Sequence, residues 1–133
     1  MSQSLSIMLI DDSAVDLFLH ERFITLKSIA RKITKFDYAG NALKYLSTLD
    51  IADWPDIILL DIQMPLMDGF DFLDKYEELP EKFRQKCHII MVSSSLDFGD
   101  ICKARANSQV LELLKKPLNI DELILLLTEH NII

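Results

Sequence analysis

Hydrophobic and polar positions divide the chain into two kinds of segment that follow one another in turn. Short, nearly uninterrupted apolar runs are typical of strands buried on both faces of a sheet, and apolar residues at helical spacing predict amphipathic helices. The pattern predicts five strands, over residues 5–10, 33–38, 57–60, 87–92 and 110–114. It also predicts five helices, over residues 14–28, 41–49, 70–78, 97–106 and 120–130.

This alternation of strand and helix predicts the fold class. Parallel strands are joined by right-handed crossover helices, so five such units make an α/β domain with a doubly wound parallel sheet and helices on both faces. Ser13 is a favourable N-cap for the first helix. That helix is expected to bury one apolar stripe, made of Val15, Leu19, Phe23 and Leu26. Gly99 weakens the fourth helix, which is therefore expected to shift easily.

Composition narrows the class of protein. A chain of 133 residues with 50% hydrophobic and 26% charged residues is globular, and we expect one domain over residues 1–133. The net charge of -7 and the lack of a basic cluster argue against nucleic-acid binding. No apolar run approaches the roughly 18 residues of a membrane span, and the first residues do not form a signal peptide. We expect a soluble, cytoplasmic protein with no membrane partner.

The two cysteines indicate neither a metal site nor a disulfide scaffold. Cys87 and Cys102 have no zinc-like spacing, and two cysteines are too few for a small secreted framework. A reduced intracellular setting fits this usage. Both residues are expected to be small members of the core.

Polar residues follow four of the predicted strands. Asp11 and Asp12 follow the first strand, Asp61 the third, Ser93 the fourth and Lys116 the fifth. Because parallel strands end at one edge of a sheet, and doubly wound sheets bind ligands at that edge, these side chains are expected to converge. Close carboxylates repel each other by about 4 kcal/mol per pair at ~4 Å and an effective dielectric of ~20. The site should therefore raise a carboxylate pKa or bind a cation, and oxygen ligands favour Mg²⁺.

Asp61 is the residue around which this site is predicted to form. It ends an apolar run, and Pro65 and Gly69 follow it, which stop a strand and turn the chain. Asp61 is therefore expected at a junction between a central strand and a loop.

Four motifs, in this order, carry a resemblance to a known family. They are Ile10-Asp11-Asp12, Asp61-Ile62-Gln63-Met64-Pro65-Leu66-Met67-Asp68-Gly69, Val92-Ser93-Ser94 and Lys116-Pro117. Over essentially its full length, the chain resembles a receiver domain of bacterial two-component response regulators, of the stand-alone kind found in chemotaxis. The resemblance implies a flavodoxin-like sheet of order 2-1-3-4-5 and a cis Lys116-Pro117 peptide.

The resemblance also implies a chemical role for each site residue. Asp61 would accept a phosphoryl group from the phosphohistidine of a sensor histidine kinase or a phosphotransfer protein. Ser93 would bond one phosphoryl oxygen and Lys116 would pair with another. Residues two beyond Asp61 and two beyond Ser93 flank the path of the hydrolytic water, and here they are Gln63 and Ser95. Neither is acidic, so self-dephosphorylation is expected to be slow.

The implied cofactor is Mg²⁺. Asp12, Asp61 and the backbone carbonyl of Gln63 would bind the ion, and Asp11 would act through water. Phosphorylation would draw Ser93 inward and so alter the surface that binds a downstream protein. Many relatives place an aromatic residue three positions before the lysine, where this chain has Leu113. The signal is therefore expected to leave through the fourth helix or through phosphorylation-dependent dimerisation of a monomer.

Two other functions fit parts of the pattern. A phosphatase related to the haloacid dehalogenases would usually carry a second Asp two residues after the nucleophile, and Gln63 stands there. The chain is therefore not expected to be a dedicated enzyme. A phosphorylation-independent interaction module is the remaining alternative, but such receivers tend to lose the acids or the lysine, and this chain retains them.

Overall fold

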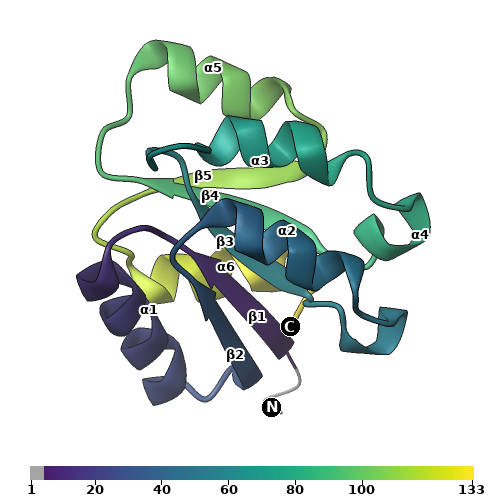
Figure 1. Cartoon of the computed structure of the whole chain (residues 1–133). Helices are drawn as coiled ribbons and strands as arrows, with labels where there is room; N and C mark the ends of the chain where they lie inside the picture. Colours follow the sequence, from purple (N-terminus) through teal and green to yellow (C-terminus); the bar gives the residue numbers. More distant parts are fainter. Residues whose placement is uncertain (1–4) are drawn as a thin grey trace.

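The computed structural model describes residues 5–133 as an α/β domain with one central sheet (Figure 1). Its five strands are β1 (Leu5–Ile10), β2 (Ala30–Phe36), β3 (Ile57–Asp61), β4 (His88–Ser93) and β5 (Val110–Lys115). Every pairing is parallel, and the strand order is β2-β1-β3-β4-β5. The predicted flavodoxin-like, doubly wound fold is confirmed.

Helices cover both faces of this sheet. They are α1 (Ala14–Leu26), α2 (Ala39–Ser47), α3 (Gly69–Tyr76), α4 (Glu81–Arg84), α5 (Phe98–Ala106) and α6 (Ile120–Glu129), with a 3₁₀ turn η1 (Ile51–Asp53). α1 and α6 pack on one face, and α2, α3 and α5 on the other (Figure 1). α4 and η1 were not predicted, because a single turn is too short to show a helical period. None of the helices in residues 5–133 is long and apolar enough to cross a membrane.

The strands differ in burial according to their place in the sheet. All residues of β1 and β3, which are central, are buried, as expected from their unbroken apolar runs. β2 lies at the edge and is only partly buried. It occupies Ala30–Phe36 rather than the predicted 33–38, because its ends pair with the ends of β1, Leu5 with Ala30 and Ile10 with Phe36.

The buried face of α1 differs from the predicted one. The residues that α1 buries are Leu17, His20 and Ile24. Three residues of the predicted stripe are exposed instead, namely Val15, Leu19 and Leu26. α1 carries apolar residues around most of its circumference, so two different stripes have helical spacing. Only packing against the sheet and α6 selects between them.

α5 is the least buried of the longer helices. Its one buried residue is Ala104, and Phe98 at its start is exposed. Cys102 is exposed on this helix, so the prediction that it belongs to the core is wrong, whereas Cys87 is buried as predicted. Few positions on α5 reach the sheet, which explains why both Phe98 and Cys102 are exposed.

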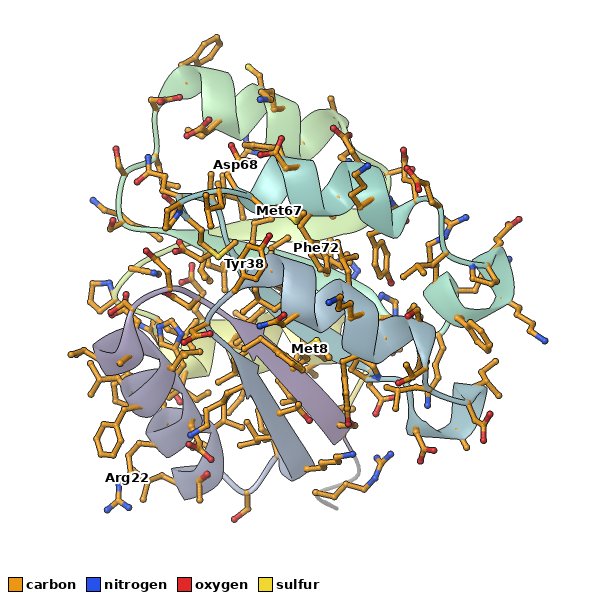
Figure 2. The ribbon with its side chains drawn as sticks, viewed as in Figure 1. Met8, Arg22, Tyr38, Met67, Asp68 and Phe72 are labelled. Carbon is orange, nitrogen blue, oxygen red and sulfur yellow. The ribbon has the colours of Figure 1, made fainter. Side chains whose placement is uncertain are left out.

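An aromatic cluster fills the core under α2 and α3. Figure 2 shows Phe72 pointing into this core, whereas Arg22 of α1 points out into solvent. Trp54, just before β3, is fully buried and donates from Nε1 to the carbonyl oxygen of Leu46 at 3.1 Å. Its ring stacks on Phe83 at 5.3 Å between centroids. Because Trp54 precedes β3, the cluster closes the amino edge of the sheet and leaves the carboxyl edge to polar residues.

Candidate functional site

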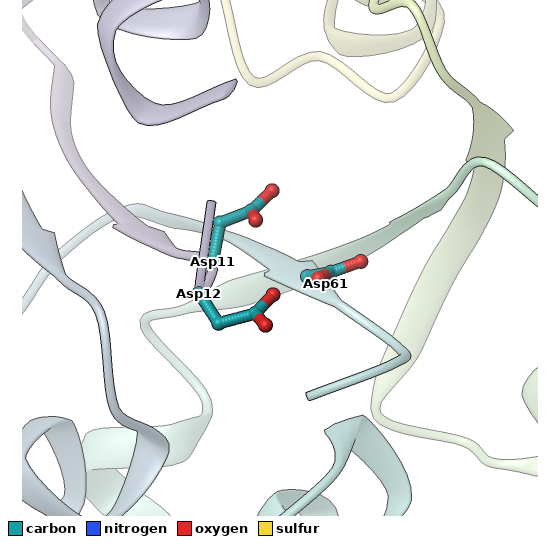
Figure 3. Close-up of side chains that lie close together, drawn as sticks. All are labelled: Asp11, Asp12 and Asp61. Atoms are coloured by element: carbon teal, nitrogen blue, oxygen red, sulfur yellow. The ribbon is translucent and has the colours of Figure 1, made fainter. Parts of the chain in front are cut away.

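Three carboxylates meet at the carboxyl edge of the sheet, as predicted. Asp11 follows β1 directly, Asp12 is its neighbour, and Asp61 is the last residue of β3. Figure 3 shows their side chains directed into one space, and one oxygen of each lies within 4.8 Å of the others. Asp11 and Asp61 are buried and Asp12 is exposed, so the cluster opens to solvent on one side.

Lys116 reaches into this cluster from the residue after β5. Its Nζ lies 2.7 Å from Oδ2 of Asp11, 2.9 Å from Oδ2 of Asp16 and 3.3 Å from Oδ1 of Asp61. An ammonium group has three N–H donors, and here each has a carboxylate within reach. The lysine side chain is nearly buried, so these ion pairs are poorly screened by water.

The electrostatics of the site show an excess of negative charge. Burial, and after it the charge of Asp11, raises the pKa of Asp61 to about 7. Burial alone would lower the pKa of Lys116, but hydrogen bonds to Asp11 and Asp16 outweigh it, and the pKa of the lysine is raised. One ammonium therefore does not neutralise the carboxylates around it. A donor set of close oxygens with surplus negative charge fits a hard divalent cation such as Mg²⁺.

The loop from β1 to α1 holds Asp11 and Asp16 in place. Oδ1 of Asp11 accepts a hydrogen bond from the backbone N–H of Ser13 at 2.9 Å. Ser13 is the N-cap of α1, as predicted, and its Oγ accepts from the backbone N–H of Asp16 at 3.2 Å. Lys116 then joins Asp16 back to Asp11. The loop, the first turn of α1 and the lysine thus form one closed ring of hydrogen bonds.

Asp16 and His20 are members of this neighbourhood that the sequence did not reveal. Asp16 lies one helical turn after the acidic pair, and His20 lies one turn further along α1. Burial lowers the pKa of His20, and the charges of Asp11, Lys116 and Asp16 also act on it. In sequence, Asp16 has only the pattern of an acid in the first turn of a helix. Its contact with a lysine 100 positions away depends on the tertiary fold.

Ser93 is fully buried at the end of β4, next to the site. Its hydroxyl donates to the carbonyl oxygen of Ser95 at 2.9 Å and accepts from the N–H of Ser95 at 3.2 Å. The backbone oxygen of Ser93 accepts from the N–H of Lys116 at 2.8 Å. The Lys116-Pro117 peptide is cis, as predicted. The structure thus places Ser93 at the expected edge, with its hydroxyl bonded inside its own loop.

The start of α3 packs directly on the end of β3. The N–H of Gly69 donates to the carbonyl oxygen of Ile62 at 2.8 Å. A Cβ at position 69 would lie 2.7 Å from the backbone oxygen of Asp61 and 2.8 Å from Cε of Met91, so this close approach requires glycine. Gln63 is exposed beside it, in a hollow of about 510 Å³ between the start of α3 and α5.

The fold and the site together define an α/β domain that gathers three carboxylates and a lysine at the carboxyl edge of a doubly wound sheet. The chain belongs to the response regulator receiver domain family, whose pattern it matches over residues 7–128. Domains of this family are signalling modules with a phosphoacceptor role in two-component systems, and they are generally not dedicated enzymes.

Relatives of known structure agree with this assignment. A response regulator receiver protein from Dyadobacter fermentans is 36% identical, with a TM-score of 0.87 over 95% of this chain and 97% of that one. A two-component response regulator from Cytophaga hutchinsonii is 30% identical, with a TM-score of 0.83 over 93% and 94% of the two chains.

A longer relative matches through part of its length. A protein-glutamate methylesterase/protein-glutamine glutaminase from Chromobacterium violaceum is 27% identical over 117 residues, which is 87% of this chain and 30% of that protein. The chain therefore spans less than a third of the length of this curated relative.

Proposed function

We propose that Asp61 is the phosphoacceptor of this receiver domain and that a histidine kinase or a phosphotransfer protein is its donor. The observation that carries the proposal is the convergence of Asp11, Asp12 and Asp61 with Lys116 at one edge of the sheet. In the transfer, a carboxylate oxygen of Asp61 attacks phosphorus while the bond from phosphorus to the donor's imidazole nitrogen breaks. The bonding pair returns to that nitrogen, and Asp61 becomes an acyl phosphate.

The same convergence supports a Mg²⁺ requirement. Asp12, Asp61 and the backbone carbonyl of Gln63 would hold the ion, and Asp11 would act through water. A divalent cation bound there supplies positive charge that offsets both the carboxylates and the incoming phosphoryl oxygens. The pKa of Asp61 is raised chiefly by burial and then by the charge of Asp11, and a divalent cation beside the carboxylate would offset both effects.

Ser93 and Lys116 are the proposed ligands of the phosphoryl oxygens. The Ser93 hydroxyl bonds Ser95 in the unphosphorylated protein, so binding the phosphoryl group would require it to leave that partner. The loop after β4 leads into α5, the least buried of the longer helices. A change at Ser93 would therefore move the α5 surface, where a downstream protein would bind.

The test is phosphorylation by a small phosphodonor such as acetyl phosphate in the presence of Mg²⁺. One phosphate per chain is expected, labile to alkali and to hydroxylamine as an acyl phosphate is. Asp61→Asn should abolish the incorporation, and a chelator should prevent it. Asp37→Asn, which removes an exposed carboxylate just beyond β2, serves as the matched control and should retain it.

This experiment also separates the proposal from its main alternative. Equal incorporation in Asp61→Asn, or incorporation unaffected by the chelator, would refute the assignment of Asp61 and the metal. Absence of phosphate in the unaltered protein would favour a phosphorylation-independent interaction module.

A further inference from the structure

The three partners of Lys116 leave no N–H donor for a phosphoryl oxygen. Asp11, Asp16 and Asp61 accept from the ammonium or pair with it at 2.7, 2.9 and 3.3 Å. A phosphoryl group on Asp61 would add oxygens beside the lysine, and pairing with one of them requires that an existing contact be given up. The contact with Asp61 is at the reacting group itself. The phosphoryl oxygens would lie beyond the Asp61 carboxylate, so the ammonium must move towards them, and that movement loosens its bond to Asp11 or to Asp16.

Burial distinguishes these two partners. The Asp11 side chain is 3% exposed, so bulk water could not replace the lysine as its partner. The Asp16 side chain is 32% exposed, so water can solvate it as soon as the lysine leaves. The carboxylate of Asp11 also accepts a hydrogen bond from the N–H of Ser13. Asp16 bonds Ser13 only through its own backbone N–H, so the carboxylate of Asp16 is able to turn outward. Releasing Asp16 costs less.

We propose that Asp16 is a positioning residue that holds Lys116 in the unphosphorylated protein and gives it up to the phosphoryl group. The inference rests on the proposed phosphorylation of Asp61. Asp16 then competes with the phosphoryl oxygens for one ammonium, and it lowers the rate of phosphorylation by the strength of its ion pair. Because Asp16 lies on the first turn of α1, this competition also couples the site to the start of that helix.

The test compares Asp16→Asn with the unaltered protein and with Asp37→Asn, using acetyl phosphate and Mg²⁺. Asp16→Asn should raise the second-order rate constant of phosphorylation about threefold to fivefold, in keeping with the loss of a partly exposed ion pair. Asp37→Asn removes the same charge from the same edge of the sheet without touching Lys116, and it should change the rate by less than about 1.5-fold. Asp16→Glu, which keeps a carboxylate, should restore a rate close to that of the unaltered protein.

A second measurement needs no variant. Beryllofluoride, which imitates the phosphoryl group, should shift the carboxyl ¹³C resonance of Asp16 in the unaltered protein and leave that of Asp37 in place. An Asp16 resonance that stays in place would mean that its ion pair with Lys116 persists. This readout decides the question even where Asp16→Asn fails to fold.

The outcomes separate this inference from the function on which it rests. An unaltered protein that takes no phosphate overturns the proposed function, and the role of Asp16 with it. An unaltered protein that is phosphorylated, with Asp16→Asn at the same rate or with an equal rise in Asp37→Asn, overturns the role of Asp16 alone. A static Asp16 resonance on addition of beryllofluoride does the same.

Discussion

At the scale of single residues, ionisation of Asp61 lowers the free energy of unfolding. Its pKa is about 7 in the folded protein, against an ordinary value of 3.8, chiefly because the carboxyl is buried and then because Asp11 is close. A raised pKa means that the folded state binds the proton more tightly than the unfolded chain does. The contribution of Asp61 to stability is therefore present below its unfolded pKa and is lost as the pH rises through about 7.

Asp61→Asn should for this reason stabilise the metal-free protein at neutral pH. The amide has no charge to desolvate, so the free energy of unfolding should rise by about 1–2 kcal/mol at about pH 8, and by less at about pH 5, where the folded protein keeps Asp61 protonated. Urea unfolding with a chelator at the two pH values measures this difference. Exposed Asp37→Asn is the control, and a gain that does not grow with pH would contradict the pKa argument.

Ser95 offers a second test at this scale, on the lifetime of the phosphorylated state. Its side chain is exposed, and its backbone bonds the Ser93 hydroxyl. A bulky or basic residue here should change the rate of phosphate loss about threefold or more, because positioning of the attacking water sets much of that rate. Mg²⁺ affinity should stay nearly unchanged, since the Ser95 side chain is not a proposed ligand.

The decay of the phosphorylated protein, followed after the donor is removed, provides the measurement. Ser108→Arg, at an exposed position before β5, is the control. Decay rates that stay flat across substitutions at both Ser95 and Gln63 would require Ser93 to be withdrawn as the phosphoryl-binding hydroxyl.

At the scale of elements, the glycines of α3 and α5 are there for different physical reasons. Gly69 begins α3 where the helix meets β3, and a Cβ there would collide with the Asp61 backbone. Gly99 lies in α5, where the atom nearest to an added Cβ would be Oδ1 of Asp97, at an ordinary contact distance of 3.5 Å. The first glycine is thus required by packing. The second mainly lowers helix propensity.

Alanine at the two positions should act in opposite directions. Gly69→Ala should lower the free energy of unfolding by about 1–3 kcal/mol and slow phosphorylation, because β3 or α3 must shift next to Asp61. Gly99→Ala should raise it by about 0.5–1 kcal/mol, since alanine favours the helix. Denaturant unfolding and phosphorylation rates of both variants test this. Equal effects of the two substitutions would show that the contact at Gly69 is not limiting.

At the scale of the whole molecule, the amino edge of the sheet is packed with apolar side chains and the carboxyl edge carries the site. Trp54 is buried before β3 at the amino edge, whereas the carboxylates lie at the carboxyl edge. The fluorescence of this one tryptophan should therefore report global unfolding and respond little to events at the site.

Mg²⁺ should stabilise the whole fold, because a ligand that binds only the folded state adds to the free energy of unfolding. The gain is about 2.7 kcal/mol at a hundred times the dissociation constant. Thermal unfolding followed by Trp54 fluorescence should show a midpoint that rises with Mg²⁺ and falls again with a chelator. Asp12→Asn should remove most of the rise, and Asp37→Asn should keep it. An equal response in Asp12→Asn would exclude Asp12 as a ligand.

The sequence by itself determined the sheet and the main members of its site. Strands buried on both faces are nearly all apolar, so β1, β3 and β4 can be recognised in the sequence as short apolar runs. Parallel strands end at one edge of a sheet, so the sequence also predicts that Asp11, Asp61 and Lys116 lie together, as they do. These inferences succeed because strand burial and strand direction are local or topological properties. They do not depend on how individual side chains turn.

Tertiary structure alone decided which side chains touch. α1 has apolar residues on several sides, so only the sheet and α6 fixed Leu17 and Ile24 as its buried face. The backbone path of the loop after β4 placed Ser95 where it pairs with the Ser93 hydroxyl. Asp16 meets Lys116 because α1 and the end of β5 are brought together by a fold whose contacts span 100 residues. Such contacts depend on distance in space, which the spacing of residues along the chain does not encode.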